Sequence, residues 1–382
     1  MARRTENQYA PDSVSPPGET LLDILEERDM SQAELARRMG RPHKTINEII
    51  HGKAAITPET ALQLEHVLGT PASFWNNREQ TYRAFLAAQA ERERLQVYTD
   101  WACQFPINDM VRLGWIQRCA DSVDQVRELL RFFGVASPVQ WQKCWASPSA
   151  FFRLARTFDS QQQALAAWLR QGEVQAHQIT CHPHDPDAFR RALKEVRQLT
   201  SASPEVFVDT LRDRCAGAGV AVVFVPQVSG ARVSGATRWL SPDKALIQLS
   251  LHYKTDDQLW FSFFHEAGHL LLHGKREMFL DHEDGSGEKE EEADRFAAEC
   301  LIPGEALKGF LNQQVSDRYP SKRSICAFAD DLGIAPGIVV GRLQHDGHIP
   351  FTHYHDLKRR FEWKQPGATR VPQDTPTTSS IS

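Results

Sequence analysis

One short stretch constrains this chain more than any other, because it keeps two histidines and a glutamate inside an apolar helical pattern. Residues 260–272 read Trp-Phe-Ser-Phe-Phe-His-Glu-Ala-Gly-His-Leu-Leu-Leu. The four-residue spacing places His265 and His269 on one helix face, where both can turn a ring nitrogen toward one Zn²⁺ ion. Glu266 lies beside them and is predicted to be the catalytic residue, which takes a proton from water. Two partly buried structural histidines are the alternative, which does not explain why so apolar a helix keeps all three residues.

An acidic helix follows this motif and offers candidates for a third ligand. Catalytic zinc usually has three protein ligands and one open position. Glu290 has Asp294 four residues later, on the same face, and metallopeptidases with a glutamate ligand share this spacing. We therefore predict Glu290 as the third metal ligand and Asp294 as the carboxylate that holds His265. Glu291 and Glu292 compete with Glu290, and a solvated acidic helix start would explain all of these residues without a metal.

The stretches 260–274 and 291–303 resemble the ImmA/IrrE metallopeptidase family, over roughly residues 205–345. The resemblance implies a zincin-like α+β fold and an endopeptidase whose protein substrate is typically a partner repressor, cut at one site. It also implies that the strand at residues 247–250 is the edge strand on the substrate side.

A second motif, near the N-terminus, has the spacing of a helix-turn-helix. With Gln32 as its first position, five residues agree in type and spacing: Leu35, Ala36, Gly40, Ile46 and Ile49. Gly40 falls at the turn, where a positive φ costs glycine least. Ser31 is a good N-cap, and Glu34 is expected to complete a capping box with it.

The second helix of this motif, expected to begin near Pro42, presents polar side chains suited to a DNA groove. Residues 31–53 contain five basic and two acidic residues, on a chain whose net charge is -5. The predicted DNA contacts are Gln32, Arg41, His43, Lys44, Thr45, Asn47 and Lys53. The alternative is a helical module that mediates dimerisation only.

The segment from Gly18 to Asn77 resembles the antitoxin-type XRE repressors of the HigA-like group. That resemblance implies a homodimer that binds a palindromic double-stranded DNA operator and regulates its own genes. The ImmA/IrrE family often works with a separate repressor, whereas here a DNA-binding module lies in the same chain.

The pattern along the chain predicts a multidomain, mainly α protein. We expect a flexible tail at residues 1–17, an all-α helix-turn-helix domain at 18–98 and a helical linker domain at 99–204. The α+β zincin-like domain follows at 205–345, and a C-terminal extension at 346–382 is expected to end in disorder. Apolar runs at 220–225 and 245–251 are predicted strands, separated by a hairpin-like stretch.

Another helix-turn-helix spacing occurs at residues 324–343, on Ile325, Ala329, Gly333 and Val339. Asp330 and Asp331 put negative charge on its first helix, which DNA phosphates would repel. The resemblance to ImmA/IrrE also places a helical pair here, so we expect a packing role.

Seven scattered cysteines without a C-x-x-C pair indicate reduced thiols and a cytoplasmic protein. No apolar run reaches the ~18 residues that a membrane span needs. The sequence thus predicts a DNA-binding regulator whose zinc endopeptidase cleaves a partner regulatory protein, to control stress, mobile-element or toxin–antitoxin genes. The alternative is a non-catalytic antitoxin-type repressor that keeps a zinc-binding peptidase fold.

Overall fold

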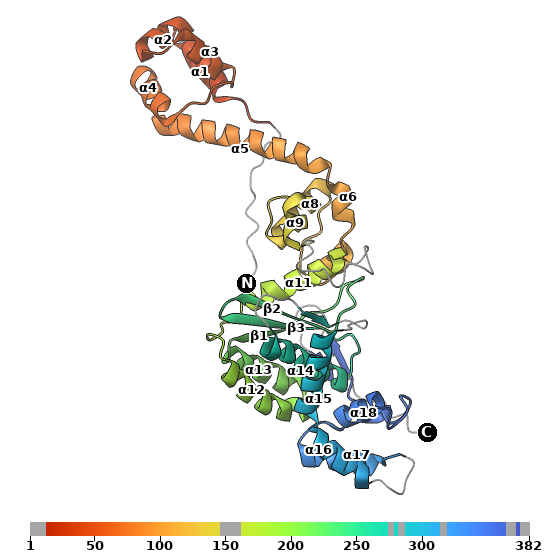
Figure 1. Ribbon diagram of the computed structural model, residues 1–382. Helices are drawn as coiled ribbons and strands as arrows, with labels where there is room; N and C mark the ends of the chain where they lie inside the picture. The colour runs from red at the N-terminus through yellow and green to blue at the C-terminus, as the bar shows by residue number, and fades with distance from the viewer. Residues whose placement is uncertain are drawn as a thin grey trace. The chain divides into compact units, whose positions relative to one another are not determined.

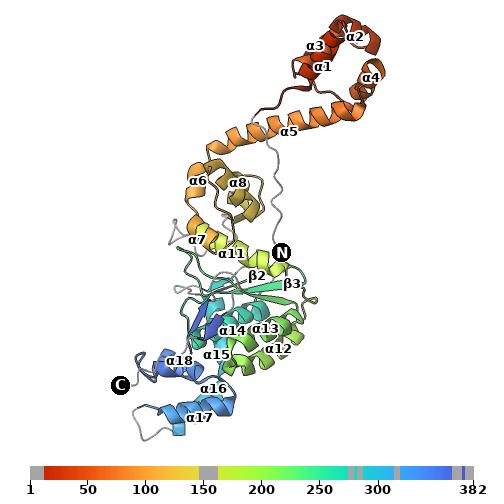
Figure 2. The ribbon, with the colours of Figure 1, turned by 180° about the vertical axis from the view of Figure 1, so that it is seen from behind.

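The structure is a computed structural model of the 382-residue chain, and it describes residues 13–145, 162–273, 279–281, 287–313, 319–363 and 372–374. It divides into two compact units, Met1–Val97 and Tyr98–Ser382. Figures 1 and 2 show the elements of each unit from opposite sides. Within the described residues no single helix is long and apolar enough to span a membrane; two short helices, Lys322–Leu332 and Pro336–His345, pass that test only together and are bent by 113°.

The N-terminal unit is a bundle of helices around one apolar core. Its helices are α1 (Pro17–Glu27), α2 (Gln32–Met39), α3 (His43–Ile50), α4 (Pro58–Leu68) and α5 (Ala72–Gln96). One apolar residue or more from each of them is completely buried, including Leu21, Leu35, Ile46, Leu64 and Trp75. The helical pattern predicted for this segment is therefore confirmed.

The second unit begins with short helices that pack around aromatic side chains. They are α6 (Thr99–Cys103), α7 (Ile107–Arg112), α8 (Ser122–Phe133) and α9 (Pro138–Trp145). Among Trp101, Phe105, Phe133 and Trp141, the centroids of neighbouring rings lie between 4.9 and 5.8 Å apart. Phe133 belongs to the buried face of α8, together with Val123, Val126, Leu129 and Leu130.

A four-stranded sheet lies at the centre of this unit. Its strands are β1 (Val220–Phe224), β2 (Gly235–Ser241), β3 (Lys244–Leu249) and β4 (Phe279–Asp281), in the order β1-β3-β2-β4. Strands β1 and β3 are parallel, and β2 is antiparallel to both β3 and β4. The two predicted strands exist, but the stretch between them contains the additional strand β2. The prediction that residues 247–250 form an edge strand is wrong, because β3 is paired on both sides.

Helices cover both faces of the sheet (Figures 1 and 2). Helix α11 (Gln162–His177) lies on one face, where Trp168 Nε1 donates to the Val225 carbonyl over 3.0 Å and Gln248 Nε2 donates to the Trp168 carbonyl over 2.7 Å. The opposite face carries α12 (Pro186–Gln198), α13 (Pro204–Ala216), α14 (Asp256–Leu272) and α15 (Glu288–Leu301). Helix α14 is therefore held between the sheet and α15.

The C-terminal part packs against the start of α14. It contains α16 (Gly304–Gln313), α17 (Lys322–Leu332), α18 (Pro336–His345), a short 3₁₀ turn at His355–Leu357, and the paired strands β5 (Phe361–Trp363) and β6 (Pro372–Asp374). Another 3₁₀ turn, Leu199–Ser201, lies between α12 and α13. Lys358 Nζ lies 2.6 Å from Asp257 Oδ2, so this segment is tied to α14. Strand β6 lies inside the stretch for which the sequence predicts disorder. The rest of that stretch after residue 363, like residues 1–12 of the predicted tail, lies outside the described residues.

Candidate metal centre and helix-turn-helix

Helix α14 carries the two histidines and the glutamate, and all three are buried. His265, Glu266 and His269 are exposed by 3%, 0% and 1%. The helix is apolar almost all round because the sheet covers one side and α15 the other. Gly268 permits this close approach, since a methyl group there would lie 3.1 Å from the Phe296 ring. The two imidazoles consequently face α15.

Helix α15 supplies two carboxylates to this face. Glu290 Oε2 lies 3.2 Å from both His265 Nε2 and His269 Nε2. Asp294, one turn further along α15, accepts a hydrogen bond from His265 Nδ1 over 2.8 Å. The predicted spacing therefore brings both carboxylates to the histidines, one to each side of the His265 ring.

Three donor atoms converge where a metal ion would sit. The two Nε2 atoms are 3.0 Å apart, and each is 3.2 Å from Glu290 Oε2. Tetrahedral zinc with bonds of 2.0–2.2 Å holds its ligands roughly 3.3 Å apart, so the spacing fits the ion. Among the described residues, these three form the one group of histidine, cysteine and acidic side chains that could hold a metal. Glu291 and Glu292, the competing candidates, are not part of it.

Burial and hydrogen bonding shift the pKa values of two of these groups, Glu290 and His269. Burial opposes ionisation of Glu290, but hydrogen bonds from His265 and His269 outweigh it and lower its pKa to about 2. Burial also lowers the pKa of His269, although Glu290 opposes that shift. An ionised carboxylate and a neutral imidazole are the forms that bind zinc, so the centre is prepared for a cation at neutral pH.

Two residues that the sequence did not indicate hold Glu266 in place. A methyl group at Gly235 would lie 2.6 Å from Glu266 Oε1, so β2 can pass the carboxylate in its present position only with glycine there. Thr237 Oγ1 donates to the backbone carbonyl of Glu266 over 3.2 Å. No local sequence pattern could have marked either residue, because the contacts join elements about thirty residues apart.

A third histidine lies on the same helix face. His273 follows His269 by four residues, and its Nε2 donates to the Lys289 carbonyl over 3.1 Å. Its Nδ1 lies 3.8 Å from Glu292 Oε2. The repeated four-residue spacing was visible in the sequence. His273 ties the end of α14 to the start of α15, which carries Glu290.

The N-terminal motif forms the predicted pair of helices. Gly40 has φ +65° at the turn, and Ser31 Oγ accepts the Glu34 amide over 3.1 Å as the N-cap. The capping box is incomplete, because the Glu34 carboxylate binds Arg37 and Arg38 instead of the Ser31 amide. The five helix-turn-helix positions fall as the spacing predicts, with the four apolar ones buried.

The residues predicted to contact DNA differ in the solvent exposure of their side chains. His43, Lys44, Asn47 and Lys53 are exposed, whereas Gln32, Arg41 and Thr45 are half-buried. The Lys44 side chain is 84% exposed. Arg41 is 22% exposed, and its guanidinium donates to Gln63 over 2.5 Å and lies 3.5 Å from Glu59. Arg41 thus joins the turn between α2 and α3 to α4.

The other helix-turn-helix spacing forms α17 and α18. Ile325, Ala329 and Val339 are completely buried in the core that also contains Trp260 of α14. The expected packing role is therefore confirmed.

Comparison with known proteins gives matches at both ends of the chain. A Helix-turn-helix family model matches residues 21–75, and an IrrE N-terminal-like domain model matches residues 218–344. YddM, an HTH-type transcriptional regulator of Escherichia coli K12, is 36% identical over 76 residues, 20% of this chain and 78% of YddM.

Two solved structures are similar over the same N-terminal segment. The Pseudomonas aeruginosa antitoxin HigA, solved with the higBA promoter, is 30% identical; the match covers 22% of this chain and 92% of HigA, with a TM-score of 0.21. An addiction-module antidote protein of the HigA family from Coxiella burnetii is 31% identical; the match covers 22% of this chain and 90% of that protein, with a TM-score of 0.21.

An N-terminal helix-turn-helix and a buried His–His–Glu cluster in an α+β domain define a two-part regulator. The first part has the fold of a DNA-binding module and the second a candidate metal centre. The chain belongs to the helix-turn-helix family of transcriptional regulators, with an XRE-type module that resembles HigA antitoxins, and it carries a C-terminal IrrE N-terminal-like domain. Both resemblances inferred from the sequence are confirmed.

Proposed function

We propose that the C-terminal unit is a zinc endopeptidase that cleaves a partner regulatory protein, a repressor, and so changes gene expression. The observation that carries this proposal is the convergence of His265, His269 and Glu290, with Glu266 buried beside them. Two imidazole nitrogens and one carboxylate form a ligand set known from catalytic zinc, which leaves a fourth position for water or substrate. The match to the IrrE N-terminal-like domain agrees with this chemistry.

In this proposal each side chain has one task. Zinc, when bound, supplies a Lewis acid that polarises a peptide carbonyl and makes water more acidic. Glu266 accepts the proton of the attacking water and delivers it to the departing amine. Asp294 accepts from Nδ1 of His265, which fixes the tautomer and turns Nε2 toward the metal position. Gly235 leaves room for the Glu266 carboxylate to stay beside that position.

The decisive variant is Glu266→Gln in the full chain. We expect it to keep its zinc, measured by elemental analysis, because Glu266 is not a proposed ligand. Cleavage should fall by at least about 100-fold, because the proton acceptor is lost. The readout is the set of new protein N-termini that labelling of terminal amines detects in cells carrying each version of the gene.

The matched control is Glu288→Gln, which changes an exposed glutamate of α15 outside the cluster. It should give the same new N-termini as the parent. The same N-termini from a zinc-loaded Glu266→Gln protein would refute the endopeptidase proposal. That result would favour a non-catalytic antitoxin-type repressor.

For the N-terminal unit, we infer that α3 enters the major groove of a double-stranded operator. A homodimer of this unit would read a palindromic site, because two-fold symmetry in the protein matches two-fold symmetry in the DNA. The exposed polar face of α3 supports this inference, as does the HTH-type regulator YddM, 78% of which matches this chain. The division into domains 18–98, 99–204 and 205–345 belongs to the same proposal.

A further inference from the structure

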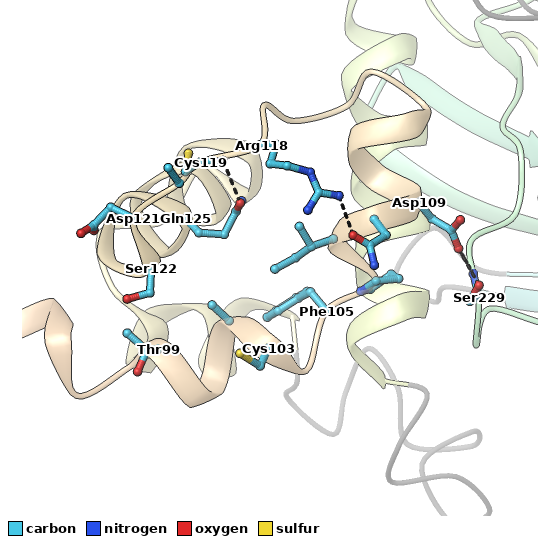
Figure 3. Close-up of a pocket in the computed structure, with 15 residues that line it drawn as sticks. Thr99, Cys103, Phe105, Asp109, Arg118, Cys119, Asp121, Ser122, Gln125 and Ser229 are labelled. Carbon is cyan, nitrogen blue, oxygen red and sulfur yellow. Dashed lines mark hydrogen bonds between the residues drawn. The ribbon is translucent and has the colours of Figure 1, made fainter.

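The short helices at the start of the second unit enclose an open cavity of about 540 Å³ (Figure 3). We propose that this cavity binds a small organic carboxylate with an apolar body, and that binding restrains the loop at residues 226–234. The regulatory consequence rests on the proposed peptidase function, because that loop leads into β2 beside Glu266. The binding itself does not.

Two hydrogen-bond donors reach into the cavity from different segments. Gln125 of α8 is 92% buried; its Oε1 accepts the Cys119 amide over 3.2 Å, and its Nε2 makes no hydrogen bond within the described part of the chain. Arg118 donates to the neutral amide oxygen of Asn108 over 2.6 Å and has no acidic partner among the described residues. Arg118 is exposed, whereas Gln125 Nε2 is a buried donor without an acceptor, which is costly; an oxygen-bearing ligand would remove that cost.

The two carboxylates that line the cavity are already engaged. Asp121 Oδ1 accepts the backbone amides of Val123 and Asp124 as the N-cap of α8. Asp109 binds Arg112 through Oδ1 and Ser229 through Oδ2. With both carboxylates already accepting hydrogen bonds, the charged group that offers donors to a ligand is Arg118, and a guanidinium favours an anionic oxygen.

One wall of the cavity is apolar, and it defines the body of the ligand. Ala102, Phe105, Pro106 and Ile107 line it along the turn between α6 and α7. Phe105, Arg118 and Gln125 project into the same space from three sides (Figure 3). A carboxylate held by Arg118 and Gln125 would lay an attached ring against the Phe105 side of the cavity. The volume exceeds that of a simple inorganic anion several times over, within the range of small-molecule sites.

The cavity is joined to the loop before β2 by one side chain. Asp109 Oδ2 accepts both the amide of Ser229 over 2.7 Å and its hydroxyl over 2.6 Å. The loop then runs to Gly235, which lies against the Glu266 carboxylate. A ligand that orders α7 would order this loop, and thereby the strand that passes the proposed catalytic residue.

Three probes of one size test the ligand chemistry on the zinc-loaded full chain. They are naphthylacetate, naphthylacetamide and naphthylmethylamine, which carry an anionic, a neutral and a cationic group on the same ring. Titration calorimetry should show saturable binding of naphthylacetate and the weakest binding of naphthylmethylamine. Arg118→Gln should weaken naphthylacetate about tenfold, because a hydrogen bond to a charged group is lost. Arg131→Gln, which changes a 78% exposed cation of α8 outside the cavity, should not.

Hydrogen exchange of residues 226–234 tests the link. Saturating naphthylacetate should slow exchange there in the parent but not in Asp109→Ala. Absence of saturable naphthylacetate binding, preference for the amine, or equal effects of the two arginine variants would overturn the binding site. Unchanged exchange with bound ligand would overturn the link. These readouts do not depend on cleavage, so they stay distinct from a failure of the peptidase proposal.

Discussion

Gly235 shows how a single residue without a side chain can define a site. Its neighbour across the sheet–helix interface is the Glu266 carboxylate, and the space between them is smaller than a methyl group needs. Glu266 is also completely buried, so it cannot turn away into solvent. The position of the proposed catalytic carboxylate is therefore determined partly by β2.

We predict that Gly235→Ala removes cleavage while zinc stays bound. The added methyl group would displace the Glu266 carboxylate, and a shift of about 1 Å can cost a factor of ~10² in rate. Zinc content and the new N-termini in cells measure the two effects. Gly309→Ala, at a position open to solvent, is the control and should behave as the parent does. Full cleavage by Gly235→Ala would show that the carboxylate has room to move.

Helical periodicity was enough to predict which site residues share a helix face. His265, Glu266 and His269 belong to one turn, so their shared location follows from 3.6 residues per turn. Glu290 and Asp294 also share one face, and the structure brings both to His265. Their roles as ligand and support stay predictions. Gly235 could not be found in this way, because its importance arises only when a distant strand meets the helix.

Among the elements, α3 carries the exposed polar side chains that are proposed to contact DNA. The sequence predicts both Arg41 and Lys44 as DNA contacts, but their side chains differ in exposure and in hydrogen-bond partners. Lys44 has its charge in solvent, with Glu48 3.8 Å away, whereas Arg41 is held between Gln63 and Glu59. Their substitutions should therefore have different consequences.

Lys44→Ala is predicted to flatten the salt dependence of binding to random-sequence duplex DNA. Each lost phosphate contact lowers the slope of log K against log salt by about one. Arg41→Ala should instead lower the unfolding temperature of the N-terminal unit, because it removes the link between the helix-turn-helix turn and α4. Arg94→Ala on α5 is the exposed control. Equal salt slopes for the parent and Lys44→Ala would remove Lys44 from the interface.

The order and pairing of the strands are less predictable from the sequence than the helices are. Residues 220–224 and 244–249 are recognisable by their apolar runs, but their parallel pairing joins segments far apart in sequence, so no local signal gives the order of the sheet. Strand β2 follows a Gly/Ser-rich stretch and contains Arg238, which binds Glu173 of α11. These polar residues interrupt the apolar pattern by which a strand is recognised, although the first residues of β2 are buried. The edge position expected of residues 247–250 came from the resemblance to ImmA/IrrE, and it is wrong because β3 pairs with both β1 and β2.

For the whole molecule, the separation into two compact units predicts two separate responses to metal removal. The parent should hold about one zinc per chain, and chelation should lower the Tm of the C-terminal unit by on the order of 5 °C. The Tm of the N-terminal unit should not change. Scanning calorimetry with and without chelator measures both transitions. His269→Ala should have lost its zinc and its sensitivity to chelator; full zinc in this variant would refute its assignment as a ligand.

The covalent joining of the two units also bears on how a substrate would be chosen. Under the proposed function, every chain bound to DNA carries one peptidase site to that operator. A protein bound at a neighbouring site then meets the centre at an effective concentration set by the tether, up to about mM for a short linker. The affinity of the peptidase site for its substrate can then be low, because binding to neighbouring DNA sites already brings the two proteins together. Selectivity would reside in the arrangement of binding sites along the DNA as much as in the peptide that is cut.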